Sequence, residues 1–544
     1  MSTGTEQPEW LNERALEQLA NQYFKALPGE EGVRQKEEGR LVSPAGPREV
    51  FDIKDPQSSL PDPHFADGRV PASVAGSGRS PGLQEVGSGG MARSGGTAGQ
   101  AYYFMDFVAP WLPGKKEAAG GTGLTAGVNG LSGLVQQPFD VNAVRGDFPI
   151  LKELVNGRPL VWLDNAATTQ KPQQVIDRIS QFYRHENSNV HRAAHELAAR
   201  ATDAYEGARK KVQNFLGAGS ANEIVFVRGA TEAINLVAKS WGEQYLGAGD
   251  EIIVSHLEHH ANIVPWQQLA ERKGCRLRVI PVDDRGQLLM DEYAKLLGPK
   301  TRLVSITQVS NALGTITPVR EIGAMAHAVG AKVLVDGAQS VSHMPVDVRA
   351  MDADWFVLSG HKLFAPTGIG VLYGKEALLN ETQPWQGGGN MIKDVTFEHT
   401  QYQNAPVRLE AGTGNIADAV GLGAAIDYVS AIGMDRIEAY EHYLLDYATR
   451  LLKEVPGLRL IGTADRKASV LSFVLDGFTN DQVGQALNKE GIAVRTGHHC
   501  AQPILRRYGL ESTVRPSLAF YNTCADVDAL VSVLWRLKRW AARG

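Results

Sequence analysis

A lysine stands just beyond an apolar run near the middle of the chain. The run Trp355–Leu358 reads Trp-Phe-Val-Leu and predicts a buried strand, and Lys362 follows it after Ser-Gly-His. Side chains just past the strands of an α/β sheet lie at the edge where such proteins bind ligands. An amine there can attack an aldehyde and form a Schiff base, whereas most lysines are solvated surface charges. Lys362 is therefore a candidate nucleophile whose interpretation depends on the residues that accompany it.

A turn suited to a phosphate group lies between a predicted strand and a predicted helix. The stretch 228–235 reads Arg-Gly-Ala-Thr-Glu-Ala-Ile-Asn, and Gly229 allows a tight turn. The helix that begins near Ala230 offers free N–H groups to an anion, and Thr231 can add its hydroxyl. An ordinary helix N-cap has the same composition, so this turn needs support from other motifs.

An aspartate ends another predicted strand. Asp336 follows Lys332–Val335, and Gln339 comes three residues later. A carboxylate in this place can pair with a protonated pyridine nitrogen, and Gln339 can reach a phenolic oxygen on the same ring. The alternative is an aspartate that caps the next element. Together with Lys362 and the phosphate turn, Asp336 favours pyridoxal 5'-phosphate as the cofactor.

Two adjacent histidines follow a further strand end. His259 and His260 come directly after Glu258. Neighbours in sequence do not face one site in a helix or strand, so we do not predict a metal site. A single histidine that stacks on the pyridine ring and moves protons is the favoured interpretation, and a histidine that only packs or caps the loop is the alternative.

One cysteine lies in a loop rich in histidine. Cys500 follows Gly497-His498-His499, and cationic histidines beside a thiol would favour its thiolate form. Cys275 and Cys524 lack such a loop and are expected to be bystanders. Arg515 in the stretch Thr-Val-Arg-Pro-Ser can hold a substrate carboxylate through two N–H groups, although a single arginine is more often solvent-exposed.

Composition bounds the class of protein. The chain has 544 residues, a net charge of -5 and three cysteines, so neither nucleic-acid binding nor a disulfide framework is expected. We see no secretory signal at the N-terminus and no apolar run long enough for a membrane span. These features indicate a cytoplasmic protein in a reducing compartment.

Strands and helices alternate along the middle of the chain, which predicts a mostly parallel sheet with helices on both faces. Helices are expected at Thr231–Trp241 and Val319–Val329, and Ala468–Leu475 and Ile492–Arg495 predict strands of a smaller α+β domain. The strands expected in the large sheet are Glu223–Val227, Glu251–Ser255, Leu277–Val282, Leu303–Thr307, Lys332–Val335, Trp355–Leu358 and Ile369–Tyr373.

The first quarter of the chain differs in composition from the rest. Residues 1–137 are rich in Gly, Ser and Pro and cannot bury enough apolar surface to fold, so we predict a disordered leader. Pro8–Leu27 has the spacing of a short amphipathic helix, and Ala101–Pro113 holds an aromatic cluster that suggests a docking motif. Packing of that cluster on the folded body is the alternative. The expected domains are this leader, a large domain at 138–408, about the first 20 residues of which can pack with the small domain, and a small domain at 409–544 that carries Cys500.

Six motifs together resemble the group II (SufS-type) cysteine desulfurases, which are fold-type I pyridoxal phosphate enzymes of the class-V aminotransferase type. The resemblance covers nearly all of the chain from Phe139 onward, with the motifs in the order of that family. The motifs are Leu-Asp-Asn-Ala-Ala-Thr-Thr-Gln-Lys-Pro at 163–172, Glu-His-His-Ala-Asn at 258–262, Val-Ser-Asn at 309–311, Asp-Gly-Ala-Gln at 336–339, Ser-Gly-His-Lys at 359–362 and Arg-Thr-Gly-His-His-Cys at 495–500.

The resemblance implies a role for each matched residue. Lys362 would be the Schiff-base lysine, Cys500 would accept sulfur from the substrate, and His259 would stack on the cofactor ring. The other implied cofactor contacts are Asp336 at the ring nitrogen, Gln339 and Asn311 at the ring oxygen, and Ala230, Thr231, Ser359 and His361 around the phosphate.

Substrate and partner contacts are also implied. Arg515 would grip the substrate carboxylate, and Asn311, Arg192 and Arg495 would line the substrate site. Thr413 would reach the phosphate of a second subunit, which implies a homodimer. The resemblance leads us to expect a proline where this chain has Gly414, and we attach no functional consequence to this difference.

The implied activity converts L-cysteine to L-alanine and passes sulfur from Cys500 to an acceptor protein or thiol, with iron–sulfur cluster assembly as one use for the sulfur. Selenocysteine lyase or another β-eliminating enzyme on the same scaffold is one alternative. A packaged scaffold protein with an idle catalytic core is another.

The leader is similar to those of desulfurases packaged in family 2 encapsulin shells. The matching pieces are residues 16–24, which read Leu-Glu-Gln-Leu-Ala-Asn-Gln-Tyr-Phe, and Tyr-Tyr-Phe at 102–104. This resemblance implies an encapsulin shell as a partner through residues 1–137.

Overall fold

The computed structural model describes residues 139–190 and 195–541. The described residues fall in one compact unit. The expected leader helix, the aromatic cluster at 101–113 and Arg192 lie outside the described residues. The predicted boundary near residue 408 between a large and a small domain stays a prediction.

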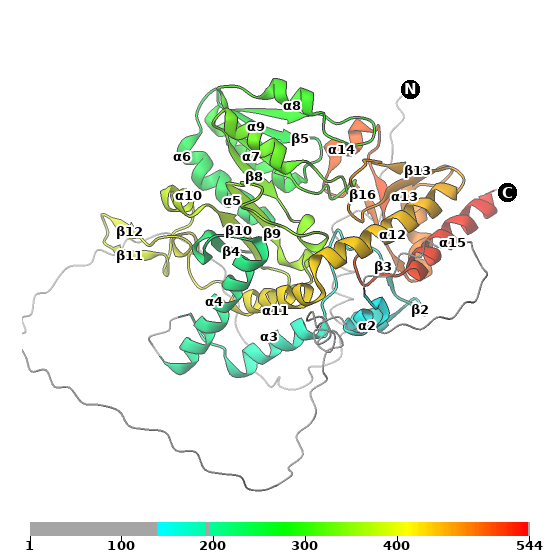
Figure 1. Ribbon diagram of the computed structural model, residues 1–544, viewed down its shortest axis with the longest axis horizontal. Coiled ribbons are helices and arrows are strands. Elements are labelled where there is room, and N and C mark those ends of the chain that lie inside the picture. Colours follow the sequence, from blue (N-terminus) through cyan, green and yellow to red (C-terminus); the bar gives the residue numbers. More distant parts are fainter. Residues whose placement is uncertain (1–138, 191–194, 542–544) are drawn as a thin grey trace, which may run out of the picture. The chain divides into compact units, whose positions relative to one another are not determined.

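A seven-stranded sheet forms the centre of the fold (Figure 1). Strand β10 pairs antiparallel with both of its neighbours, and the other pairs in this sheet are parallel, which confirms the predicted mostly parallel sheet. The strands in spatial order are β4 (Ile224–Val227), β10 (Gly370–Gly374), β9 (Trp355–Ser359), β8 (Lys332–Asp336), β7 (Thr301–Thr307), β5 (Glu251–Ser255) and β6 (Arg276–Ile280).

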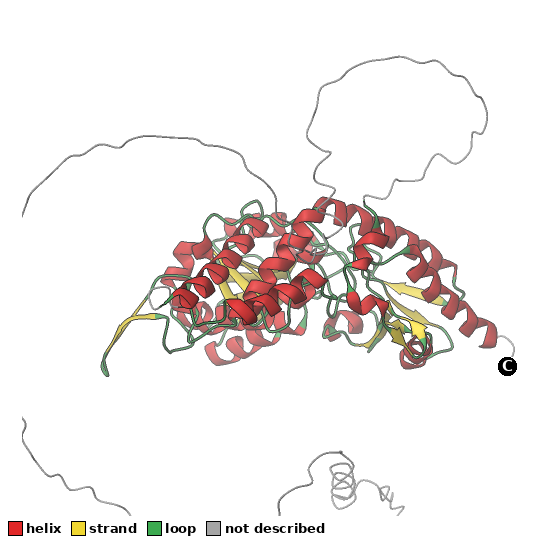
Figure 2. Cartoon of the chain, turned by 90° about the horizontal axis from the view of Figure 1, so that it is seen from below, coloured by secondary structure: helices red, strands yellow, loops and turns green. Residues whose placement is uncertain are grey.

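Both faces of this sheet are buried, which explains why its strands are continuously apolar. In β9, Trp355 and Val357 pack into one core, and Phe356 and Leu358 pack into the core on the opposite face. Successive side chains of a strand point to opposite faces, so one apolar run serves two helix layers. The strands lie between helices in Figure 2.

The helices of the sheet region alternate with its strands. Helix α9 (Val319–Ala328) occurs where the sequence predicts it, whereas the predicted helix Thr231–Trp241 changes from α5 (Ala230–Val237) to a π-turn at Ala238–Gly242. The other helices of this part are α3 (Gln173–His185), α4 (Glu196–Leu216), α6 (Glu243–Tyr245), α7 (Val264–Lys273), α8 (Met290–Leu296), α10 (Glu376–Glu381) and α11 (Ile416–Ile432).

Helix α11 packs against α3 and α4 and is buried along most of its length. It passes close to α4 at Gly423, where a Cβ atom would lie 3.1 Å from the Cβ atom of Ala208. Among the described helices no single one is long and apolar enough to cross a membrane, and only the bent pair α11 and α12 (Met434–Glu454) meets that length and composition together.

A second, smaller sheet follows α12. Its strands in order are β13 (Leu458–Ile461), β14 (Ser472–Leu475), β17 (Thr513–Arg515) and β16 (Arg495–Gly497). The strand predicted at Ile492–Arg495 is wrong as a single element, because β15 (Ile492–Ala493) instead pairs in parallel with β3 (Val161–Trp162). Helices α2 (Val141–Gly146), α13 (Asn480–Lys489), α14 (Gln502–Arg507) and α15 (Cys524–Ala541) complete this part.

Two short hairpins lie outside these sheets. Strands β1 (Leu154–Val155) and β2 (Arg158–Pro159) form the first, and β11 (Ile392–Val395) and β12 (Thr400–Tyr402) form the second. The second hairpin extends away from the helices in Figure 2, and Phe397 near its tip is fully exposed.

Candidate active site

A pocket of about 170 Å³ lies where several strands of the large sheet end. Asp336 ends β8 and Ser359 ends β9, and both line this pocket. The structure thus brings together twelve residues that the sequence singled out, namely Ala230, Thr231, His259, Asn311, Asp336, Gln339, Ser359, His361, Lys362, Arg495, Cys500 and Arg515.

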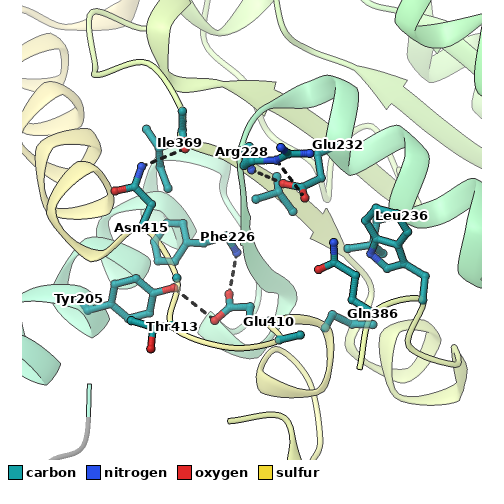
Figure 3. A pocket seen from close by; sticks show the side chains of 16 residues that line it. Tyr205, Phe226, Arg228, Glu232, Leu236, Ile369, Gln386, Glu410, Thr413 and Asn415 are labelled. Atoms are coloured by element: carbon teal, nitrogen blue, oxygen red, sulfur yellow. Dashed lines mark hydrogen bonds and ion pairs between the residues drawn. The ribbon is translucent and has the colours of Figure 1, made fainter. Parts of the chain in front are cut away.

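Thr413 lies elsewhere, in a separate pocket of about 730 Å³ (Figure 3). Its neighbour Glu410 forms an ion pair with the buried Arg209 at 2.8 Å and accepts an N–H bond from Phe226 at 2.7 Å. These contacts fix the start of the segment that carries Thr413. Within its own chain Thr413 therefore does not join the pocket that contains Lys362.

The phosphate turn is built around Ser359. The N–H group of Ala230, at the start of α5, donates to the Ser359 hydroxyl oxygen at 2.9 Å. This bond leaves the hydroxyl hydrogen of Ser359 available as a donor beside Thr231. A side chain at Gly229 would place its Cβ atom 3.2 Å from the same oxygen, so the close approach of the turn to β9 favours glycine.

Lys362 and Asp336 carry opposite charges and both line the pocket. Burial lowers the pKa of Lys362 to about 8, and the nearby Asp336 carboxylate opposes that change. Burial raises the pKa of Asp336, while the N–H of Ala338, at 2.9 Å, and Lys362 stabilise its charged form. A cationic ring nitrogen would be a further partner for this carboxylate.

The lowered pKa predicts how Lys362 reacts with an aldehyde. Only the neutral amine attacks, so attachment of pyridoxal 5'-phosphate to the cofactor-free protein should accelerate about tenfold per pH unit below pH 8 and level off above it. Stopped-flow absorbance between about pH 6 and 10 measures this rate. A rate that keeps rising toward pH 10.5, the ordinary lysine value, would contradict the lowered pKa.

His259 is held as a neutral ring. Its Nδ1 atom accepts the N–H of Ala261 at 3.0 Å, so the ring proton lies on Nε2. Burial, aided by the positive charge of Lys362, lowers the pKa of His259 to about 3. A neutral imidazole suits stacking on an aromatic cofactor, and its Nε2–H can donate a hydrogen bond.

The loop that carries Cys500 is hydrogen-bonded to the segments that follow β5 and β7. The side-chain amide of Asn311 donates to the carbonyl oxygen of His499 at 2.6 Å, and the N–H of His260 donates to that of Cys500 at 2.7 Å. His499 and Cys500 adopt left-handed backbone angles, with φ of 54° and 56°. Such strain persists only where surrounding contacts impose it, so the position of the thiol is specified by the fold.

The electrostatic setting of Cys500 differs from the sequence expectation. His499 is buried and its pKa falls to about 2, so it is neutral rather than cationic. Lys362 and Arg515 are instead the cationic groups that interact with the thiol. Burial of the histidine ring could not be deduced from its place beside Cys500, and it removes one of the charges expected to favour the thiolate.

Three potential metal ligands also meet here. Ligand atoms of His260, His498 and Cys500 lie within 4.8 Å of one another. However, His498 Nδ1 accepts the N–H of Cys500 and His260 Nε2 accepts that of Gln502, so one nitrogen of each ring already has a hydrogen bond. The absence of a metal site stays a prediction.

Sequence reasoning gave no role to Asp164, although it lies in a motif that was noticed. Its carboxylate pairs with Nη2 of Arg515 at 3.2 Å, while Nη1 of Arg515 donates to the carbonyl oxygen of Asn311 at 2.9 Å. Arg515 is 1% exposed. Arg515, which the sequence predicts to bind a carboxylate, is thus held in a fixed orientation. The sequence signal that could have identified Asp164 is its place just after the strand predicted before it.

Comparisons with known proteins place the fold in a family. Residues 161–530 match the family described as aminotransferase class-V. A cysteine desulfurase of Dickeya dadantii is 53% identical over 402 residues, which cover 74% of this chain and 97% of that protein. The chain belongs to the class-V aminotransferase family.

Further relatives have the same name but are longer. A cysteine desulfurase of Synechococcus elongatus is 70% identical over 400 residues, and a probable cysteine desulfurase of Mycobacterium leprae is 64% identical over 399. These matches cover 74% and 73% of this chain but only 64% and 65% of those proteins, which is less than two thirds of their length. The crystal structure of the cysteine desulfurase CsdA from Escherichia coli matches with a TM-score of 0.69 at 40% identity, covering 74% of this chain and 99% of that one.

Class-V aminotransferases use pyridoxal 5'-phosphate, and the pocket fits this cofactor. Asn311 Oδ1, Gln339 Oε1 and Arg515 Nε are buried without a hydrogen-bond partner among the described residues. Unpaired buried polar atoms are costly, so the pocket is suited to a polar group that pairs with them. Lys362, Asp336 and the phosphate turn supply the groups that an aldehyde, a pyridine nitrogen and a phosphate each require.

Proposed function

We propose that this class-V aminotransferase is a cysteine desulfurase of the group II (SufS-type) kind. It converts L-cysteine to L-alanine and passes the sulfur atom to an acceptor protein or thiol. The observation that carries this proposal is the presence of Cys500 in the same pocket as Lys362. The loop that bears the cysteine is short, with only His498–Ala501 between β16 and α14, and its backbone accepts a hydrogen bond from Asn311 in the turn after β7.

The chain's own groups have distinct tasks in this reaction. The guanidinium of Arg515 binds the substrate carboxylate, and Asn311 and Arg495 line the same space. The cofactor, when bound, withdraws electrons from the substrate and thereby makes its sulfur atom open to attack. Asp336 keeps a positive charge at the ring nitrogen favourable, and the amine of Lys362 takes up and returns the proton on the substrate α-carbon.

In the proposed reaction the sulfur atom of the substrate thiol is transferred to the thiol of Cys500. The Cys500 thiolate attacks the substrate sulfur, an S–S bond forms and the substrate C–S bond breaks, with its electron pair left on carbon. A proton then replaces sulfur on that carbon, which yields L-alanine, and Cys500 carries a persulfide. The acceptor takes the outer sulfur and restores the thiol, so no outside oxidant is required.

Alanine formation tests the proposal. Protein loaded with pyridoxal 5'-phosphate should release equal amounts of L-alanine and sulfide from L-cysteine in the presence of a thiol reductant. The same assay with L-selenocysteine addresses the alternative. Turnover of selenocysteine with none of cysteine would favour a selenocysteine lyase, and turnover of neither by protein that holds the cofactor would favour an idle packaged scaffold.

The proposed enzyme is a homodimer in which Thr413 completes the site of the partner. Two observations support this arrangement. Thr413 lines a pocket of about 730 Å³ outside its own active site, and the β11–β12 hairpin exposes Phe397 fully. A second copy that meets this face would cover both the pocket and Phe397.

Co-expression of two inactive variants tests whether Thr413 acts in the active site of the partner subunit. Lys362→Ala lacks the amine, and Thr413→Ala should lose cofactor on dialysis. If Thr413 acts across the interface, a co-expressed heterodimer contains one fully intact site, so about half of the wild-type cofactor content and activity should return. No recovery, or normal cofactor retention in Thr413→Ala alone, would contradict the shared site.

The leader, residues 1–137, is proposed to direct the enzyme into an encapsulin shell within the cytoplasm. Support comes from its composition and from the two short matching motifs, at 16–24 and 102–104. A chain that begins at residue 138 should retain turnover and lose co-purification with shell protein produced in the same cells. Packaging of the shortened chain to the full-length level would reject this role.

A further inference from the structure

The carbonyl group just before Lys362 in the chain is surrounded by hydrogen-bond donors. The oxygen of His361 accepts the N–H of Thr169 at 3.1 Å, and the hydroxyl groups of Thr168 and Thr169 donate to it at 3.0 and 3.2 Å. The amine of Lys171 donates to the same oxygen at 3.1 Å. Four donors from one short segment thus meet an oxygen that has two lone pairs, so the peptide between His361 and Lys362 is held in place.

The hydroxyl group of Thr169 connects the two sides of Lys362. Its oxygen accepts the N–H of Phe364 at 2.8 Å, and its hydrogen is directed to the carbonyl oxygen of His361. Phe364 is fully buried and has a φ of 58°, a left-handed angle that a bulky residue adopts only where surrounding contacts impose it. One side chain therefore holds the backbone both before and after Lys362.

Lys171 donates only to uncharged oxygen atoms. Its amine bonds to the carbonyl oxygens of Thr169 and His361 and lies 3.5 Å from the hydroxyl oxygen of Thr168, and no carboxylate pairs with it among the described residues. Burial lowers the pKa of Lys171 to about 8, so the amine remains mostly protonated at neutral pH. A desolvated ammonium group without a carboxylate costs free energy, so packing alone does not explain a lysine at this place.

The segment that supplies these donors is itself fixed on its other side. The indole N–H of Trp162 donates to the carbonyl oxygen of Thr168 at 3.2 Å, and the N–H of Gln170 donates to the hydroxyl oxygen of Tyr521 at 3.1 Å. Thr168, Thr169 and Lys171 do not line the pocket that contains Lys362. Any effect of these three side chains on the reaction must therefore act through the backbone that they hold.

We propose that Thr168, Thr169 and Lys171 are positioning residues that clamp the backbone around Lys362 and thereby aim its amine. In the proposed function this amine attaches the cofactor and moves the proton on the substrate α-carbon, so it must return to one place in every turnover. A fixed backbone limits the positions that the free side chain can reach. The inference rests on the role proposed for Lys362 and does not depend on Cys500.

Exchange of the α-proton of L-alanine in deuterium oxide tests the clamp, because it requires the amine of Lys362 and no sulfur transfer. Three variants loaded with cofactor are compared with the wild type. Thr169→Val replaces the hydroxyl with a methyl group, Lys171→Met removes the ammonium group, and Lys171→Arg keeps N–H donors at similar reach. The exchange rate per bound cofactor and the KM for alanine are measured by nuclear magnetic resonance, and the melting temperature is recorded for each protein.

Two variants away from the pocket serve as matched controls. Lys273→Met removes an amine that donates to the carbonyl oxygen of Glu243 at 2.8 Å, and Thr382→Val removes a buried hydroxyl that donates to that of Leu378 at 2.7 Å. None of these four residues lines the pocket that contains Lys362. Both controls should exchange the α-proton at the wild-type rate.

If the clamp aims the amine, Thr169→Val and Lys171→Met each lower the exchange rate per bound cofactor by about tenfold, with the KM for alanine unchanged. Lys171→Arg retains most of the wild-type rate. Attachment of pyridoxal 5'-phosphate to the cofactor-free variants, which reports on the amine without any substrate, slows in the same order. If Lys171→Met fails to fold, Thr168→Val takes its place in the comparison.

A purely structural role would lower the melting temperature and leave the exchange rate per bound cofactor unchanged, and that result in either Thr169→Val or Lys171→Met would overturn the proposal. A loss in Lys171→Arg as large as that in Lys171→Met, or an equal loss in the controls, would also overturn it. Absence of exchange in the wild type would reject both the clamp and the role of Lys362. Exchange of alanine without turnover of cysteine would count against the desulfurase assignment alone.

Discussion

Replacing Cys500 with alanine is expected to lower alanine formation from L-cysteine by about 10³-fold or more. In the proposed reaction the thiolate is the nucleophile that receives sulfur, and alanine has no group that can replace it. The cofactor should remain bound with its normal absorbance, because Lys362 and Asp336 do not hydrogen-bond to the Cys500 side chain. Initial rates of alanine release by wild-type and variant protein, loaded to the same cofactor content, measure the effect.

The other two cysteines provide matched controls. Cys275 hydrogen-bonds to the carbonyl oxygen of Gly247, and Cys524 lies near the Tyr443 hydroxyl, so neither borders the pocket that contains Lys362. Cys275→Ala and Cys524→Ala should therefore turn over cysteine at the wild-type rate. Undiminished cysteine turnover by Cys500→Ala would assign the chemistry to a β-eliminating enzyme in which this thiol is a bystander.

Asp336→Asn is expected to reduce turnover by about 10² to 10³-fold, the usual cost of removing one preorganised electrostatic contact. Asparagine keeps the shape and can still accept the N–H of Ala338, at 2.9 Å in the wild type. What it loses is the negative charge that, in the proposed site, would stabilise a protonated ring nitrogen. The measurement is kcat for alanine release, together with the cofactor content of the purified variant.

A control variant at a second aspartate, Asp283, distinguishes this electrostatic effect from a general cost of removing a negative charge. Asp283 lies at a turn, where its carboxylate accepts the N–H groups of Arg285 and Gln287 at 2.9 Å. Asp283→Asn should leave kcat unchanged. Equal turnover by wild type and Asp336→Asn, at equal cofactor content, would exclude a role for this carboxylate at the ring nitrogen.

The large sheet could be predicted because its strands are buried on both faces. A strand such as β9 has no polar alternation, and its apolar run and the polar motif that follows it mark the element and its end. The strand predicted at Ile492–Arg495 failed for the opposite reason. Its residues separate into β15 and β16 of two different sheets, and no local pattern records a pairing with Val161, which lies more than 300 residues away.

The site could be predicted as a set of residues but not as an electrostatic arrangement. Strand ends and motif order placed Lys362, Asp336 and Cys500 together, and the pocket contains all three. The neutral state of His499 and the pairing of Asp164 with Arg515 depend on burial and on contacts between distant segments. Such contacts are set by tertiary packing and have no signature in residue spacing.

The most direct test of the account is a single turnover without reductant or acceptor. Loaded enzyme mixed with L-cysteine should form up to one L-alanine per active site, and mass spectrometry should find one added sulfur atom on the peptide that contains Cys500. The account predicts that alanine and persulfide appear in equal amounts and that Cys500→Ala forms neither. Alanine or free sulfide released without any sulfur on Cys500 would contradict it.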